Sequence, residues 1–233
     1  MIDARTNEVC GAEALVRWRH PEKGLIGPDQ FIPLAESTGL IVPLGNWVLQ
    51  RACADAATWP ANTKVAVNIS AAQLKDANLF DVILCTLVET GLPPDRLELE
   101  ITETVLTANQ EKHLASIRQL KNLGISVAID DFGTGFSSMT QLTLFPFDKI
   151  KIDKSFAQGF LTRRDHKAII ESTILLARGL DLKVTAEGIE TPEQLRHMQA
   201  AGVDFVQGYL LGRPVPLSQF DARSSSMHGE MVA

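Results

Sequence analysis

Hydrophobic and polar positions along the chain alternate with two periods, which predict short strands and amphipathic helices in turn. The predicted strands cover residues 12–18, 65–69, 97–101, 125–129, 147–152, 183–186 and 205–206. The predicted helices cover residues 31–53, with a break near Gly39 and Pro43, and residues 79–90, 111–123, 137–144, 167–180 and 192–201. Strands and helices that alternate in this way form a parallel sheet with right-handed connections.

Almost every predicted strand carries a polar residue near its carboxyl end. These residues are Glu13, Asn68, Glu100, Asp130, Lys151, Glu187 and Gln207. In a closed β/α barrel the carboxyl ends of all strands meet at one mouth, whereas an open doubly wound sheet gathers such residues only at its switch point. The ring therefore favours an α/β fold of the TIM-like (β/α)8 barrel type. Because residues 1–10 are polar and turn-like, we expect the eighth strand to lie before residue 1 and to be absent from this chain.

Length and composition suit one globular domain. The chain has 233 residues, of which 45% are hydrophobic and 21% charged. We expect a single domain over residues 1–220 and a disordered tail over residues 221–233. The net charge of −6 argues against a DNA or RNA partner bound through a broad basic face.

The cysteines and the hydrophobic segments suggest where the chain acts. Cys10, Cys53 and Cys85 are odd in number and widely spaced, which argues against a disulfide framework and favours a reducing, cytoplasmic compartment. The first residues are too polar for a signal peptide, and no apolar run is long enough to span a membrane. We expect no membrane contact from this chain itself. It is expected either to act alone in the cytoplasm or to be the cytoplasmic part of a larger, membrane-anchored signalling protein.

The acidic members of the ring have the chemistry of a metal site. Glu13, Asn68, Glu100, Asp130 and Asp131 all offer oxygen atoms, which suit Mg²⁺, Mn²⁺ or Ca²⁺ rather than zinc. The set has more carboxylates than one ion needs, and one of the aspartates is able to bridge, which suggests two ions about 3.5–4 Å apart. Such a pair suits in-line attack of water on a phosphodiester. Taken alone, the Asp130-Asp131 pair also fits a turn that caps a helix.

Charged residues next to these ligands are candidates for substrate contact and proton transfer. Lys151 is placed to stabilise developing charge or hold the attacking water, and Glu187 is placed to accept a proton or to ligate a metal through water. Arg17 lies two residues beyond Leu15, so we expect both on the same side of the strand. Arg17 is placed to bind a phosphate oxygen. An ion pair between Lys151 and Asp153 remains an alternative.

Several motifs in order over residues 11–216 resemble one family, the EAL-domain cyclic-di-GMP phosphodiesterases. They are Glu13-Ala14-Leu15, Asn68-Ile69-Ser70, Glu100-Ile101-Thr102-Glu103, Asp130-Asp131-Phe132-Gly133-Thr134-Gly135, Lys151-Ile152-Asp153, Ala186-Glu187-Gly188-Ile189-Glu190 and Gln207-Gly208-Tyr209. The resemblance implies a modified eight-stranded barrel with one antiparallel strand. It also implies hydrolysis of cyclic-di-GMP to linear pGpG by a homodimer with two Mg²⁺ or Mn²⁺ ions, with Ca²⁺ inhibitory.

The resemblance also assigns roles to individual residues. It makes Glu13, Asn68, Glu100 and Asp130 ligands of one metal, and Asp130 and Asp131 ligands of the second. Lys151 and Glu187 resemble the catalytic residues that position or deprotonate the water. Arg17, Asp153 and Gln207 resemble substrate-binding residues, Gln207 through a metal-bound water. Glu103 resembles the anchor of the loop that begins at Asp130 and links dimerisation to activity.

Two other functions compete with the phosphodiesterase. The first is a non-catalytic cyclic-di-GMP receptor, which the completeness of the ring disfavours. The second is a barrel enzyme acting on sugar phosphates, which lacks an evident phosphate loop after the final strands. The family also has a Tyr-Gln-Pro-like strand before the position of Met1, which we expect to be missing here together with one guanine contact.

Overall fold

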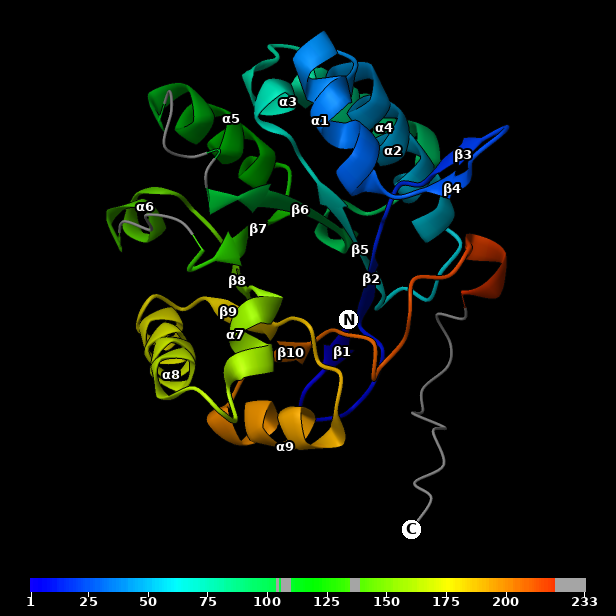
Figure 1. The fold of residues 1–233 in the computed structure, drawn as a ribbon. Helices are drawn as coiled ribbons and strands as arrows, with labels where there is room; N and C mark the ends of the chain where they lie inside the picture. Colours follow the sequence, from blue (N-terminus) through cyan, green and yellow to red (C-terminus); the bar gives the residue numbers. More distant parts are fainter. Residues whose placement is uncertain (104, 106–109, 135–138, 221–233) are drawn as a thin grey trace.

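A computed structural model describes residues 1–103, 105, 110–134 and 139–220, and its main sheet is a ring of eight strands (Figure 1). The strands neighbour one another in the order β1-β10-β9-β8-β7-β6-β5-β2. Their bounds are β1 Ile2–Asp3, β2 Gly11–Glu13, β5 Lys64–Asn68, β6 Leu97–Thr102, β7 Ser126–Phe132, β8 Lys149–Ile152, β9 Lys183–Ala186 and β10 Phe205–Val206. All neighbours are parallel except β1, which is antiparallel to β10. The predicted α/β barrel is confirmed.

Helices lie outside this ring and link its strands (Figure 1). Their bounds are α1 Pro28–Thr38, α2 Ile41–Ala56, α3 Ala71–Lys75, α4 Leu79–Thr90, α5 Gln110–Asn122, α6 Met139–Leu144, α7 Lys154–Gly159, α8 Arg164–Gly179 and α9 Pro192–Ala201, with 3₁₀ turns η1 Pro94–Arg96 and η3 Leu217–Gln219. The predicted break between α1 and α2 falls at Gly39, which has a left-handed φ of 77°. No helix in the described part of the chain has the length and hydrophobicity needed to cross a membrane.

The eighth strand lies inside the first ten residues, so its predicted position before residue 1 is wrong. Ile2 of β1 pairs with Val206 of β10 and forms an isolated antiparallel bridge with Val9 on its other side. The Met1 nitrogen donates to the Gly11 carbonyl over 2.9 Å, which ties β1 to the start of β2. These bonds close the ring between the two strands at the ends of the sheet order.

A turn between β1 and β2 explains why the hydrophobic pattern does not predict β1. The carboxylate of Asp3 accepts hydrogen bonds from the backbone nitrogens of Arg5 and Thr6, and Asn7 has a left-handed φ of 59°. A strand of two residues next to such a turn offers no alternation for a periodicity argument to detect.

Two further predictions about elements need correction. The predicted strand over residues 12–18 ends at Glu13, and Trp18 belongs to a separate antiparallel hairpin made by β3 (Trp18–His20) and β4 (Gly24–Ile26). The short helices α3 and α7 were not predicted, because five or six residues are too few to show a helical period.

The predicted tail over residues 221–233 lies outside the described residues, as does the start of the predicted helix over 137–144.

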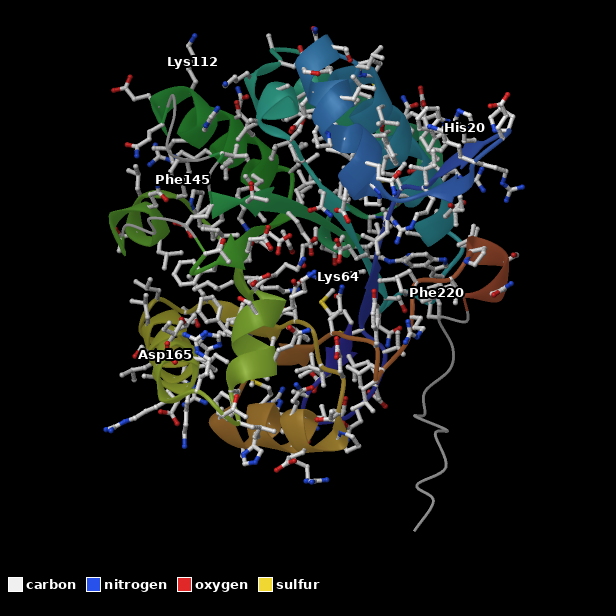
Figure 2. The ribbon with its side chains drawn as sticks, in the orientation of Figure 1. His20, Lys64, Lys112, Phe145, Asp165 and Phe220 are labelled. Carbon is white, nitrogen blue, oxygen red and sulfur yellow. The ribbon has the colours of Figure 1, made fainter. Side chains whose placement is uncertain are left out.

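The strands separate an apolar layer from a charged interior. In β6, Leu97, Leu99 and Ile101 are fully buried among apolar residues, whereas the alternate residues Glu98 and Glu100 face ionic partners across the ring. Strand residues alternate between faces, so the same strand serves both layers. Lys64 also points to the inside of the ring (Figure 2), with its Nζ 3.0 Å from Ser126 Oγ. The barrel interior therefore has to be stabilised by ion pairs.

We predict that Ile2→Ala lowers the free energy of unfolding by about 2–5 kcal/mol, because it removes a buried contact from the strand that closes the ring. Thermal denaturation should show a melting temperature lower by roughly 4 °C or more. The control is Leu25→Ala, which truncates a side chain that is 67% exposed on β4. Equal melting temperatures for the two variants would show that β1 does not stabilise the barrel.

Candidate functional site

The Lys151 ammonium lies at the centre of a carboxylate cluster at one mouth of the barrel. Its Nζ is 2.7 Å from Glu100 Oε2, 2.8 Å from Glu187 Oε1, 3.1 Å from Asp130 Oδ1 and 3.9 Å from Glu13 Oε2. The Lys151 side chain is only 2% exposed. The structure thus brings together five residues that the sequence placed at successive strand ends.

A β-bulge brings Asp131 to the same cluster. Ile129 of β7 is in register with Ile150 of β8, but Phe132 is in register with Ile152, so two residues of β7 face one residue of β8. Asp131 adopts a left-handed φ of 53°, and its backbone nitrogen donates a hydrogen bond to Asp130 Oδ1 over 3.0 Å. The rule that neighbouring strand residues point to opposite faces therefore does not hold at this pair.

The bulge has an energetic cost and a chemical consequence. A residue other than glycine in a sparsely populated backbone region costs about 1–3 kcal/mol, and such strain is concentrated at functional sites. Ligand atoms of Asp130, Asp131 and Glu187 lie within 4.8 Å of one another. Three carboxylates so close together repel one another unless a cation lies between them.

Two amides flank the cluster and fix Glu13. Asn68 Nδ2 donates to Glu13 Oε1 over 2.8 Å, and Gln207 Nε2 donates to Glu13 Oε2 over 2.7 Å. Asn68 is the last residue of β5, which neighbours β2, and Gln207 comes directly after β10, which neighbours β1. Both Glu13 oxygens are therefore oriented by side chains from distant parts of the chain.

Burial and charge change the acidity of the clustered groups. Burial raises the pKa of Glu100 well above its usual range, an effect that Lys151 opposes and that Glu13, Asp130 and Glu98 reinforce. Burial likewise raises the pKa of Glu187 to about 7. The pKa of Asp131 is also raised, first by burial and then by Asp130 and Asp153.

Glu13 and Lys151 shift toward their charged forms. Burial by itself raises the pKa of Glu13, but the Lys151 ammonium and the two amide hydrogen bonds outweigh it, so the pKa is lowered. Burial by itself lowers the pKa of Lys151, but the surrounding carboxylates, Glu100 first, raise it well above its usual value. Lys151 therefore stays an ammonium, and it is one positive charge among five acidic side chains.

The donor set fits divalent cations that prefer oxygen. Glu100 Oε2 is buried and lies 2.7 Å from Lys151 Nζ without hydrogen-bond geometry, so among the described residues it has no hydrogen-bond donor. Every side chain of the cluster except Lys151 offers oxygen atoms. The cluster has five carboxylates and one side-chain ammonium, so acidic groups outnumber basic ones. Such a set suits Mg²⁺ or Mn²⁺, which carboxylates bind well, and it offers nothing that zinc would select.

The other predicted site residues are placed differently. Arg17 is exposed, and its guanidinium donates to the Val16 carbonyl over 2.9 Å rather than to the cluster, so its role stays a prediction. Asp153 caps α7 by accepting from the Ser155 nitrogen, while Lys151 pairs with the cluster instead. The predicted role of Asp153 in substrate binding also stays a prediction.

Glu103 lies just beyond β6 and is only 2% exposed. Its Oε2 accepts a hydrogen bond of 3.4 Å from the nitrogen of Gly133, which follows β7 at a left-handed φ of 95°. This contact ties Glu103 to the segment after Asp131, and its role as an anchor of that loop stays a prediction. The rest of that loop, residues 135–138, lies outside the described part of the chain.

Sequence reasoning missed a second ion pair inside the barrel. Lys149 Nζ lies 2.7 Å from both carboxylate oxygens of Glu98, and the two side chains are 6% and 1% exposed. The signal was present, because Lys149 precedes Lys151 by two residues and Glu98 precedes Glu100 by two. Residues two apart in a strand point to the same face.

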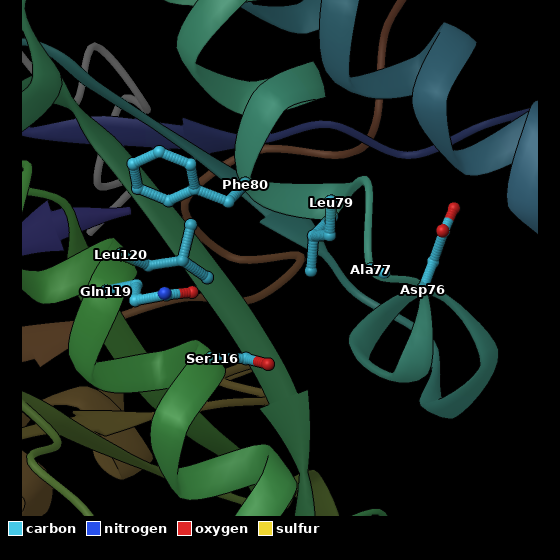
Figure 3. Close-up of a pocket in the computed structure, with 7 residues that line it drawn as sticks. All are labelled: Asp76, Ala77, Leu79, Phe80, Ser116, Gln119 and Leu120. Atoms are coloured by element: carbon cyan, nitrogen blue, oxygen red, sulfur yellow. The ribbon is translucent and has the colours of Figure 1, made fainter.

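A surface pocket elsewhere on the molecule has a different lining. It has a volume of about 120 Å³ and lies between the start of α4 and the face of α5 (Figure 3). Its lining residues are Asp76, Ala77, Leu79, Phe80, Ser116, Gln119 and Leu120. None of them belongs to the carboxylate cluster, and the cluster remains the candidate site because its acidities are strongly perturbed.

A family model described as EAL domain matches residues 1–214. An uncharacterized signaling protein of Caulobacter vibrioides is 50% identical over 214 residues, which are 92% of this chain and 26% of that protein. The bifunctional diguanylate cyclase/cyclic di-GMP phosphodiesterase MucR of Pseudomonas aeruginosa is 42% identical over 220 residues, 93% of this chain and 32% of MucR. The chain thus spans about a quarter to a third of the length of these relatives.

Solved structures are similar over nearly the whole chain. The PaMucR phosphodiesterase in a c-di-GMP complex has a TM-score of 0.90 and 41% identity, and the match covers 94% of this chain and 90% of that one. The FimX EAL domain of Pseudomonas aeruginosa bound to c-di-GMP has a TM-score of 0.83 and 26% identity, with 89% and 85% covered.

We predict that Glu187 makes the metal-free protein less stable as pH rises. Its folded pKa of about 7 exceeds its ordinary 4.5, so its contribution is fully present below pH 4.5 and is lost as pH rises through 7. The change is about 3 kcal/mol at most. Urea unfolding of EDTA-treated protein from pH 5 to 8 should show a shallower fall in stability for Glu187→Gln. The control, Glu193→Gln on the exposed side of α9, should keep the parent slope; parent-like slopes for both variants would contradict the assignment.

Proposed function

Because the chain belongs to the EAL domain family, we propose that it is a divalent-metal-dependent phosphodiesterase that hydrolyses cyclic di-GMP to linear pGpG. The observation that carries the proposal is the convergence of Glu13, Glu100, Asp130 and Glu187 on the Lys151 ammonium. Similarity to MucR and to the PaMucR c-di-GMP complex supports the choice of substrate.

The cluster offers two sets of metal ligands in this proposal. Glu13, Asn68, Glu100 and Asp130 would hold one Mg²⁺ or Mn²⁺ ion, and Asp130 and Asp131 would hold the second. When bound, the ions supply positive charge that stabilises the phosphoryl transition state and increases the acidity of water. Asp130 would be the shared ligand, and the bulge at Asp131 would let both carboxylates serve the same site.

The remaining residues act on water and substrate. Lys151 stays protonated, so it donates hydrogen bonds and orients the attacking water while stabilising negative charge on the phosphate. Glu187, with a pKa near 7, accepts the proton of that water at Oε1. Water adds to phosphorus, the bond from phosphorus to the 3′ oxygen breaks, and that oxygen takes up a proton to give a product with a 5′ phosphate.

Three residues contribute to binding in the same scheme. Gln207 holds Glu13, to which its Nε2 donates over 2.7 Å, and it would orient a water at the first metal. Arg17 and Asp153 contact the nucleotide, Arg17 through a phosphate oxygen. Arg17 is exposed and close in sequence to Glu13, which leaves its guanidinium able to turn toward a bound anion.

We also propose that the chain acts as a homodimer in the cytoplasm. The motif resemblance supports the dimer. The thiols of Cys10, Cys53 and Cys85 are free in the described structure, which suits a reducing compartment. The chain spans about a quarter to a third of its longer relatives, so we propose no partner for it other than cyclic di-GMP and a second copy of itself.

We predict that the purified chain converts cyclic di-GMP to pGpG with Mg²⁺ or Mn²⁺, as measured by chromatography of the nucleotides. Asp130→Asn should lower kcat more than about 100-fold, because a shared ligand matters more than an outer-shell partner. Arg17→Ala should mainly raise KM. Ca²⁺ should support binding but little turnover, because its coordination is looser.

The outcomes separate the competing functions. Tight binding of cyclic di-GMP with no product under any of these ions would establish a receptor in place of an enzyme. Turnover by Asp130→Asn near that of the parent would contradict the two-metal proposal while leaving the substrate unchanged.

We predict that Glu103→Ala lowers kcat but leaves Mn²⁺ affinity nearly unchanged, because Glu103 contacts the Gly133 nitrogen rather than the carboxylate cluster. Calorimetric titration of Mn²⁺ into the metal-stripped variant measures the affinity. The matched control is Glu100→Ala, which removes a candidate ligand three residues away and should lose affinity strongly. An equal loss in both variants would show that Glu103 acts on the metals directly.

A further inference from the structure

The second buried ion pair, Glu98–Lys149, lies in the barrel beneath the carboxylate cluster and has no part in the proposed chemistry. The ammonium of Lys149 contacts both oxygens of Glu98 at 2.7 Å. The ammonium also lies 3.3 Å from the sulfur of Met1 and 4.6 Å from the centroid of the Phe205 ring. It interacts electrostatically with the amino group of Met1 and with the thiol of Cys10. Among the groups named here, Glu98 is the one carboxylate.

The strand register offers Lys149 a second partner. Lys149 of β8 is in register with Ala128 of β7, and Ala128 is in register with Glu100 of β6. Two strand spacings of about 4.8 Å separate Lys149 from Glu100 along this line, a span that the two long side chains can bridge. The Ala128 side chain between them is a single methyl group and does not block the approach.

The same neighbourhood already holds the Lys151 ammonium, and the amino group of Met1 interacts with Glu13 and Glu100 as well. Lys151 Nζ lies 2.7 Å from Glu100 Oε2, and this oxygen has no hydrogen-bond donor among the described residues. A second ammonium at Glu100 would add positive charge to a candidate metal ligand. Like charges in one site oppose each other, so the second ammonium and a divalent cation would compete.

We propose that Glu98 is a positioning residue that retains Lys149 and so keeps a competing ammonium away from the metal-binding cluster. The inference deepens the proposed metal site and rests on that proposed function. It assigns to Glu98 an effect on cation affinity that is exerted through Lys149, without contact to the metal or the substrate.

The test is calorimetric titration of Mn²⁺ into EDTA-stripped parent and variants of the whole chain. Glu98→Gln should weaken Mn²⁺ binding about tenfold or more, the size of effect that one nearby charge has on proton binding. Lys149→Met should bind Mn²⁺ as the parent does. The double variant Glu98→Gln/Lys149→Met should regain most of the affinity lost in Glu98→Gln, because the competing ammonium is gone.

A merely structural pair behaves differently. Each single variant leaves a buried partner unpaired, so both should lower the melting temperature. If affinity followed stability, both single variants would lose Mn²⁺ binding, and that result would overturn the inference. Parent-like affinity in Glu98→Gln, or a double variant as weak as Glu98→Gln, would overturn it as well.

Two further measurements keep the test decisive. If Glu98→Gln does not fold, Glu98→Asp serves in its place: the shorter carboxylate should retain Lys149 less well and weaken Mn²⁺ binding, with recovery when Lys149→Met is added. Hydrolysis of cyclic di-GMP by the parent is measured separately. If the parent binds Mn²⁺ but makes no product, the proposed function alone is wrong. If the parent makes product but the Mn²⁺ affinity does not depend on Glu98, this inference alone is wrong.

Discussion

The ammonium of Lys151 is buried where strands β2, β6, β7 and the end of β9 converge on β8, and four carboxylates lie within 3.9 Å of it. Removing a charge from water costs several kcal/mol, which only well-placed partners repay. Each partner comes from a different strand, so the same contacts that stabilise the ammonium also tie the strands together at the mouth. The mouth is therefore organised before any ligand arrives.

That organisation leaves the cluster with an excess of negative charge. Burial raises the pKa of Glu100 and Glu187, and the bulge at Asp131 adds another carboxylate in a strained backbone conformation. Strain and uncompensated charge in one place are typical of a site shaped by function at the expense of stability. In the proposed function, divalent cations would neutralise the acids that the bulge brings together, and their binding would offset the cost of the strained backbone.

Much of this could be predicted from sequence because it depends on period and direction. Parallel strands with polar carboxyl ends have one mouth, so the positions of Glu13, Glu100, Asp130 and Glu187 followed from their places in the chain. The side-chain contacts of Arg17 did not follow, because strand β2 ends at Glu13 and the chain beyond it no longer obeys the strand period. The bulge at Asp131 was hidden for a related reason, since one inserted residue changes facing without changing composition. The two-residue strand β1 was too short to carry any pattern.

The antiparallel direction of β1 determines the route by which the backbone reaches the barrel. Because β1 runs against its neighbour β10, its amino end points toward the mouth, where the other strands have their carboxyl ends. The Met1 nitrogen donates to Gly11 at the start of β2, and Ile2 pairs with Val206 of β10. A peptide joined to Met1 would therefore continue between Gln207 and Glu13. The antiparallel strand therefore places the amino end of the fold beside the hydrogen bond that orients the oxygens of Glu13.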